Sequence, residues 1–195
     1  MKSSLRIKAK KKRALINLKP ESKNTFLKHI KSCLDNIFSI DNSIKVIGLY
    51  HPILNEISPL GFTKYFKTKN IINALPVVLV NTKEMVFKKW NEKEKLQKGL
   101  LGNYEPSLTN ETVLPQIIVV PTLMFDRKLN RLGYGGGYYD KSIFSLKQYF
   151  HQEEKSFFAI GIAYSEQETK SIPYESHDQK LDFIVTEKEI LSKVD

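Results

Sequence analysis

One glycine-rich segment, residues 131–140 (RLGYGGGYYD), concentrates the residue types that could bind an anion. Its glycines can adopt positive φ and direct successive backbone N–H groups at one phosphate. Arg131 adds a guanidinium fork for phosphate oxygens, and Asp140 adds a hard oxygen for Mg²⁺. Three aromatic rings could wall in a flat ligand: Tyr134, Tyr138 and Tyr139. The segment favours a phosphate-binding turn, and a glycine-rich loop without a ligand is the alternative.

The glycine spacing matches neither of the common nucleotide-binding fingerprints. No Gly-Lys-Ser/Thr follows, as a P-loop requires, and Tyr138 stands where GxGxxG needs its third glycine. The segment follows a buried strand expected at Gln116–Val120 and precedes a helix expected at Tyr139–Gln152. The carboxyl end of a strand and the N-terminus of a helix are both places where α/β proteins bind anions.

The remaining chain alternates between helical and strand-like patterns. Helices are expected at about 4–18, 23–38 and 59–68, and strands at 45–50, 74–80, 85–89, 157–164 and 183–186. Gly99–Asn110 reads as a polar, turn-rich loop. This alternation predicts an α/β layered fold with a mainly parallel sheet flanked by helices. Since no linker divides the chain, we expect a single domain over residues 1–195.

Composition narrows the function classes further. The net charge of +10 would attract nucleotides and nucleic acid alike, but no nucleic-acid motif accompanies the basic run Lys8–Arg13. That run is expected to be a solvated helix face. The lone Cys33 excludes an internal disulfide, and no apolar run approaches the roughly 20 residues of a membrane span. We expect a cytoplasmic, monomeric protein with no membrane and no nucleic-acid partner.

Five segments in order resemble the 5-formyltetrahydrofolate cyclo-ligase family, also called 5,10-methenyltetrahydrofolate synthetases. They are KSSLR at 2–6, LYHPILNEIS at 49–58, Glu105-Pro106, PTLMFDRKLNRLGYGGGYYD at 121–140, and AYSEQE through IPYESHDQKLDFIVTE at 163–187. The resemblance covers nearly the whole chain. It implies a fold related to the sugar-phosphate isomerase and CoA-transferase type.

The same resemblance implies an ATP- and Mg²⁺-dependent ring closure. The family converts 5-formyltetrahydrofolate, which can carry a polyglutamate tail, to 5,10-methenyltetrahydrofolate with release of ADP and phosphate. The γ-phosphoryl group passes to the formyl oxygen, and the neighbouring folate nitrogen then displaces phosphate from this phosphorylated formyl intermediate. Positioning and charge neutralisation are the protein's task in such chemistry.

Site residues follow from the resemblance by position. The expected ATP-binding residues are Lys2, Ser3, Ser4, Leu5, Arg6, Arg131, Leu132, Gly133, Tyr134, Gly135, Gly136, Gly137, Tyr138 and Tyr139. The expected folate-binding residues are His51, Glu56, Tyr134, Gly135, Gly136, Gly137 and Tyr138. Arg131 and Tyr138 are the expected catalytic residues, and Asp140 and Asp178 the expected Mg²⁺ ligands. Trp90 and Tyr104 could cover a ligand ring or could simply be packing residues.

Each of these residues also has a plainer interpretation. Lys2 and Arg6 could be exposed residues of a basic helix, and His51 a strand-end histidine with a local hydrogen bond. Glu56 could be a solvated carboxylate, and Asp140 could cap the following helix. Two functional alternatives also stay open. They are another ATP- or sugar-phosphate-using enzyme and a non-enzymatic RNA-binding protein.

The chain departs from the family pattern at several positions. Gln116 stands where Asp is frequent, Thr122 and Leu129 replace glycines, Lys141 replaces the usual Arg, and Asn103-Tyr104 replaces an apolar-Pro pair. None of these changes removes an expected phosphate or metal ligand. They place the geometry of the neighbouring loops in question.

Overall fold

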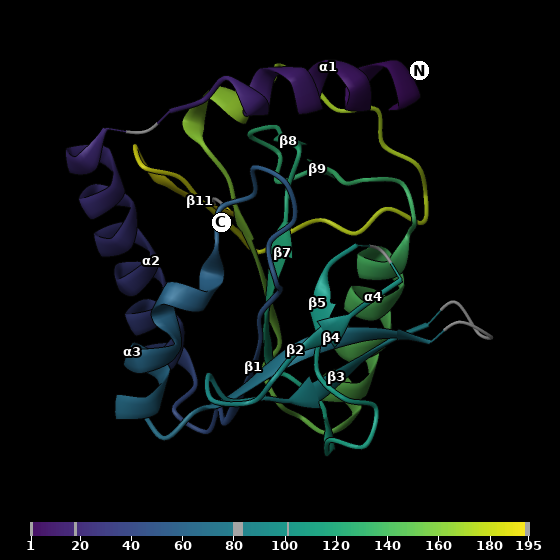
Figure 1. The fold of residues 1–195 in the computed structure, drawn as a ribbon. Coiled ribbons are helices and arrows are strands. Elements are labelled where there is room, and N and C mark those ends of the chain that lie inside the picture. Colours follow the sequence, from purple (N-terminus) through teal and green to yellow (C-terminus); the bar gives the residue numbers. More distant parts are fainter. Residues whose placement is uncertain (1, 18, 80–83, 101, 194–195) are drawn as a thin grey trace.

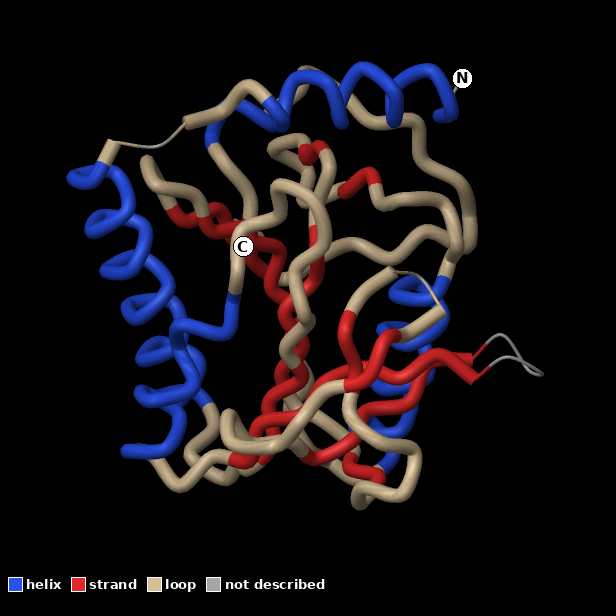
Figure 2. The backbone as a smooth tube through the Cα atoms, viewed as in Figure 1, coloured by secondary structure: helices blue, strands red, loops and turns tan. Residues whose placement is uncertain are grey.

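The computed structural model describes residues 2–17, 19–79, 84–100 and 102–193. Its centre is an eight-stranded sheet of order β12-β11-β10-β7-β1-β2-β3-β6, drawn in Figures 1 and 2. The strands are β1 (Val46–Gly48), β2 (Ile72–Leu79), β3 (Glu84–Lys89), β6 (Thr112–Val113), β7 (Ile117–Pro121), β10 (Phe158–Ile162), β11 (Phe183–Val185) and β12 (Ile190–Ser192). The five strands from β11 to β2 run parallel, and antiparallel strands flank them on both sides.

Helices cover both faces of this sheet, as the alternation of patterns predicted. On one face, α2 (Pro20–Ile40), the short 3₁₀ helix η1 (Pro59–Phe62) and α3 (Thr63–Thr68) pack on β1, β7 and β10 through a core that includes Ile37 and Phe66. On the other face, α4 (Tyr138–Gln152) buries Ile143 and Leu146 against the central strands. The strands are apolar on both faces because both faces are covered.

The helix α1 (Lys2–Ala14) lies across one end of the sheet and not along a face, as Figure 1 shows. The hairpin of β8 (Met124–Phe125) and β9 (Arg131–Leu132), which follows the central strand β7, lies beneath it. Leu5 and Ala9 of α1 pack on this hairpin in a small separate cluster. Figure 2 shows loops gathered at the same end. None of the described helices is long and apolar enough to cross a membrane.

Most expected elements exist with shifted ends. The first helix spans Lys2–Ala14, earlier than expected, because Pro20 forms the first turn of α2. The expectation of a plain loop at Gly99–Asn110 was wrong, since β5 (Tyr104–Glu105) pairs with β4 (Gln97–Lys98) there. The strands β6, β8, β9 and β12 were not predicted; each has two or three residues, too few for a periodic pattern. Val80, the expected end of one strand, lies outside the described residues.

Candidate functional site

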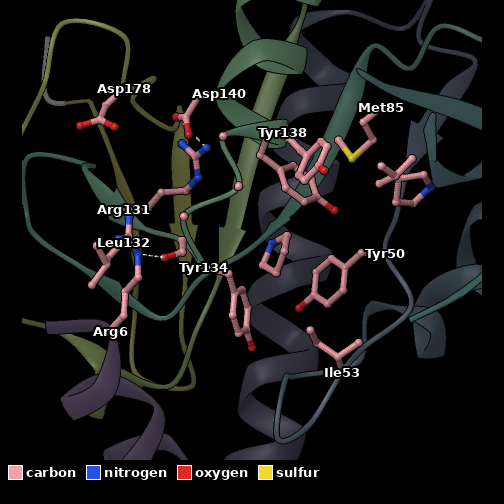
Figure 3. Close-up of a pocket in the computed structure, with 18 of the residues that line it drawn as sticks. Arg6, Tyr50, Ile53, Met85, Arg131, Leu132, Tyr134, Tyr138, Asp140 and Asp178 are labelled. Carbon is pink, nitrogen blue, oxygen red and sulfur yellow. Dashed lines mark hydrogen bonds and ion pairs between the residues drawn. The ribbon is translucent and has the colours of Figure 1, made fainter. Parts of the chain in front are cut away.

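A cavity of about 740 Å³ opens at the carboxyl end of the parallel strands, beneath α1. Most of its wall comes from four segments that are distant in sequence. They are the start of α1, the loop after β1, residues 131–140 and the loop at 175–178. Figure 3 shows that Arg6, Arg131, Asp140 and Asp178 lie on one side, whereas Tyr50, Ile53 and Met85 lie on the other. The cavity thus has a charged end and an aromatic, apolar end.

The glycine-rich segment forms the centre of the wall as a tight turn that leads into α4. Gly135 and Gly137 have φ values of +101° and +71°, and Gly137 is the N-cap of the helix. A side chain at Gly135 would also crowd Arg6, whose Cζ would lie 3.0 Å from the new Cβ. The segment therefore requires glycine at two positions, and it places the N-terminus of a 15-residue helix at the cavity.

An ion pair between an arginine and an aspartate holds the side chains of the charged end in place. Arg131, whose side chain is only 4% exposed, donates from Nη2 to Asp140 Oδ1 at 2.9 Å and from Nη1 to the carbonyl of Gln179 at 2.6 Å. The backbone N–H of Gln179 donates to the same Asp140 oxygen. Asp140 lies in the first turn of α4 and is held by these tertiary partners, and the N-cap of the helix is Gly137 and not Asp140.

A second ion pair joins the first turn of α1 to the loop near the C-terminus. Lys2 Nζ lies 2.6 Å from Asp178 Oδ2 and 3.2 Å from Glu175 Oε1. Burial favours the neutral form of both partners. The hydrogen bonds between them outweigh this effect, so the pKa of Asp178 is lowered and that of Lys2 is raised. Arg6, one turn further along α1, donates from Nε to the Gly133 carbonyl at 2.9 Å.

Buried polar groups lie at the aromatic end. Glu56 Oε2 accepts a hydrogen bond from the backbone N–H of Ile53, and burial raises the pKa of this carboxyl. Within the described residues, Glu56 Oε1 and His51 Nδ1 are buried without a hydrogen-bond partner. Because buried polar atoms are rarely left unpaired, these two mark positions where a ligand's polar groups would fit. The plainer interpretations of both residues, a solvated carboxylate and a locally bonded histidine, are therefore disfavoured.

The cavity brings together most of the predicted site residues. Its lining includes Lys2, Ser3, Arg6, His51, Glu56, Arg131, Leu132, Gly133, Tyr134, Gly135, Gly136, Gly137, Tyr138, Tyr139, Asp140 and Asp178. Ser4 and Leu5 do not line it, and Leu5 packs against the β8–β9 hairpin. For Trp90 the packing interpretation holds, because it is buried in the core with α2 and α3. Tyr104 lies outside the lining, with its ring centroid 5.2 Å from that of His51.

Sequence reasoning missed Arg13, which is only 3% exposed. The basic run Lys8–Arg13 was expected to face solvent, and this is wrong for its last residue. Arg13 lies seven residues after Arg6 and eleven after Lys2, so all three share the face of α1 that turns toward the glycine-rich segment. This helical spacing was visible in the sequence and could have found it.

Three of the departures from the family pattern have defined surroundings in the structure. Gln116 Oε1 accepts a hydrogen bond from the backbone N–H of Lys45 and so links the starts of β7 and β1. Thr122 is buried and donates to the Val120 carbonyl. Leu129 adopts φ +63° within the β8–β9 turn, the conformation that glycine would take without strain. The turn itself is fixed by Asp126, whose buried carboxylate accepts backbone N–H groups of Lys128, Asn130 and Ile172.

The fold and the cavity define an α/β protein with a glycine-rich turn at a helix N-terminus and a cavity with a charged and an aromatic end at one end of its sheet. Comparison with known proteins narrows this class. The sequence profile of the 5-formyltetrahydrofolate cyclo-ligase family matches residues 1–187. The chain is 32% identical over 142 residues to the 5-formyltetrahydrofolate cyclo-ligase of Haemophilus influenzae, covering 70% of this chain and 73% of that one.

Further relatives point to the same family. Identity to the 5-formyltetrahydrofolate cyclo-ligase of Mycoplasma pneumoniae is 30% over 145 residues, 74% of either chain. Two solved 5,10-methenyltetrahydrofolate synthetases are similar in structure. That from Aquifex aeolicus has a TM-score of 0.71 at 27% identity, covering 98% of this chain and 92% of the other. That from Mycoplasma pneumoniae has a TM-score of 0.68 at 26% identity, covering 94% and 97%.

The chain therefore belongs to the 5-formyltetrahydrofolate cyclo-ligase family, whose ATP-using enzymes convert 5-formyltetrahydrofolate to 5,10-methenyltetrahydrofolate.

Proposed function

We propose that this chain carries out the cyclo-ligase reaction in the cavity beneath α1, with ATP phosphates at the charged end and the folate ring at the aromatic end. The observation that carries the proposal is the assembly of cations, carboxylates and glycine amides on one side of a 740 Å³ space and of orphaned buried polar atoms on the other. One ligand alone would not need both ends.

The charged end supports phosphate binding by three kinds of donor. Lys2 and Arg6 approach from α1, Arg131 approaches from β9, and the turn at 133–137 directs its backbone toward the same space. The N-terminus of α4 adds the helix dipole. Since the γ-phosphoryl group spreads negative charge as it leaves ATP, these cations would stabilise the transfer.

Asp140 and Asp178 fit a Mg²⁺ ion in chemical character. Mg²⁺ takes one or two carboxylates and completes its shell with phosphate oxygens and water. Both carboxylates line the cavity, and within the described residues no cluster of three or more metal-ligating side chains exists. When bound, the ion would neutralise charge between the phosphates. The cations Lys2 and Arg131 would then turn from the carboxylates to the phosphates, which need the same partners.

The aromatic end supports binding of the pterin ring. Glu56 can accept hydrogen bonds from the amino-substituted ring edge, and His51 offers a second polar contact. Tyr138 and Met85 provide flat and apolar wall surface. The 5-formyl group would then point toward the charged end. Phosphorylation of its oxygen makes a good leaving group for ring closure by the neighbouring nitrogen, and we assign Arg131, at the charged end, and Tyr138 as the residues that would assist this step.

The proposal is tested by the absorbance of the methenyl-folate product after mixing the protein with 5-formyltetrahydrofolate, ATP and Mg²⁺. We expect an absorbance rise that requires both ATP and Mg²⁺. Asp140→Ala should abolish it, whereas Asp35→Ala, a matched change at an exposed surface pair with Lys69, should not. No rise in a folded protein that binds ATP would favour another ATP-using enzyme. Salt-dependent RNA binding without ATP hydrolysis would favour the non-enzymatic alternative.

Three further properties belong to the same proposal. We infer one cyclo-ligase domain over residues 1–195, because both large core clusters share the central sheet. The parallel strands with helices on both faces support a relation to the sugar-phosphate isomerase and CoA-transferase folds. A monomer in the cytoplasm is supported by a cavity built from one chain and by the buried, unpaired Cys33.

A further inference from the structure

Arg13 is a buried cation that the proposed chemistry has not used. Its side chain is 3% exposed, as is that of Glu56, and Arg13 Nη1 lies 3.8 Å from Glu56 Oε1. Its Nη2 donates to the Tyr134 hydroxyl, and its Cζ lies 5.7 Å from the centroid of the same ring. One guanidinium thus reaches two residues that line the aromatic end of the cavity.

This contact is unusual for a purely structural ion pair. At 3.8 Å, Arg13 Nη1 and Glu56 Oε1 attract each other without a hydrogen bond, and neither atom has another hydrogen-bond partner among the described residues. A buried ion pair that only stabilised the fold would be expected to close this gap, because unpaired buried groups are costly. The gap leaves Glu56 Oε1 able to accept a hydrogen bond from a ligand.

Arg13 itself is not part of the cavity wall. It lies behind Glu56 and Tyr134, so it can act on a ligand only through them. We propose that Arg13 is a positioning residue, which holds the Glu56 carboxylate and the Tyr134 hydroxyl in place to receive the hydrogen-donating edge of a ligand ring. The identity of that ring as a pterin rests on the proposed function.

The charges around Glu56 give this role a measurable signature. Burial raises the pKa of Glu56, whereas the Ile53 N–H, Tyr134 and the positive charge of Arg13 lower it. The other titratable groups that interact with Glu56 are the buried Tyr50 and the partly buried Tyr139, whose pKa values are themselves raised by burial. Both are neutral near pH 7, so Arg13 is the positive charge that faces Glu56 and favours its ionised form. Without it, Glu56 would bind a proton at higher pH and lose its capacity to accept ligand hydrogen bonds.

The first test needs no substrate. The pKa of Glu56 is measured by carbon NMR of the glutamate-labelled protein, with the resonance assigned through Glu56→Gln. We expect a higher Glu56 pKa in Arg13→Met than in wild type, and a value close to wild type in Arg13→Lys. Lys10→Met is the control, because Lys10 also lies over the Tyr134 ring but is not paired with Glu56. An unchanged Glu56 pKa in Arg13→Met would overturn the proposal.

The second test separates positioning from general stability. In Arg13→Met, KM for 5-formyltetrahydrofolate should rise roughly 10- to 100-fold, with KM for ATP nearly unchanged. The loss of folate affinity as pH falls should also begin at higher pH than in wild type. Equal increases in both KM values would instead indicate a structural role and overturn the proposal.

Two outcomes keep the inference distinct from the proposed function. If wild type does not bind 5-formyltetrahydrofolate but the Glu56 pKa still depends on Arg13, the pterin assignment fails and the positioning role stands. If Arg13→Met does not fold, Arg13→Lys is used to test the positioning role instead. It keeps the positive charge but lacks the fork that reaches both partners, so its KM for folate should rise several-fold with an unchanged pH profile. A KM for folate equal to that of wild type would refute positioning.

Discussion

Replacement of Leu129 by glycine would restore the residue that the family pattern favours, but we expect it to destabilise this protein. Leu129 adopts φ +63°, which is strained for a side chain, yet its side chain is only 3% exposed and packs in the core with α4. Its N–H donates to Asp126 and its carbonyl accepts from Leu181, so the backbone is held in this conformation. Glycine at this position would relieve the backbone strain but would remove a buried side chain from the core, so the two effects on stability oppose each other.

The sizes of these two opposing effects decide whether the substitution stabilises or destabilises the protein. Loss of a buried leucine side chain costs about 2–5 kcal/mol. Relief of the left-handed strain returns about 1–2 kcal/mol, less about 0.4–1 kcal/mol for the greater freedom of glycine in the unfolded chain. Leu129→Gly should thus lower the free energy of unfolding by roughly 1.5–4 kcal/mol, or about 4–15 °C in Tm for a chain of this size. Leu129→Ala, which keeps the strain, should be less stable than Leu129→Gly by about 0.5–1 kcal/mol.

Urea denaturation of the two variants and of wild type measures these differences. The helical Leu146, also buried in the core, is the matched control. There the order should be reversed, with Leu146→Ala more stable than Leu146→Gly, because glycine is unfavourable inside a helix. The reasoning is refuted if Leu129→Gly equals or exceeds wild type in stability, or if Leu129→Ala is more stable than Leu129→Gly.

Two further predictions concern the ion pair between α1 and the C-terminal loop. Lys2→Met should raise KM for ATP roughly tenfold or more without a similar effect on KM for folate. Steady-state kinetics with each substrate varied in turn measures both constants. Equal increases in the two KM values would contradict this prediction. Because the folded pKa of Asp178 is lowered, its stabilising contribution is present above its unfolded pKa, near the ordinary 3.8, and is lost as pH falls through the folded value. Urea melts should therefore show wild type more stable than Asp178→Asn at pH 7 and the difference shrinking below about pH 4, and a difference that grew there would contradict the assigned pKa.

The sequence predicted the parts of this structure that repeat a pattern. Apolar runs such as that around Ile118 identified the buried strands, and the glycines before Tyr138 identified the turn and the helix that follows. The pairing of Lys2 with Asp178 could not be predicted from the residues alone, because it joins positions 176 residues apart and depends on where α1 lies. The sequence also left both interpretations of Trp90 open, since an aromatic residue at a strand end suits a core and a ligand equally well.

The way α1 is attached has a consequence for the order in which this protein folds and opens. Of its residues only Ala9 and Arg13 are buried, and most of its tertiary polar contacts reach the glycine-rich segment and the C-terminal loop, more than 100 residues away. Contacts of such long sequence separation pay a high loop-closure entropy, so they form late. The helix can also detach at a lower free energy than the sheet. Hydrogen exchange would therefore find the α1 amides far less protected than those of β7.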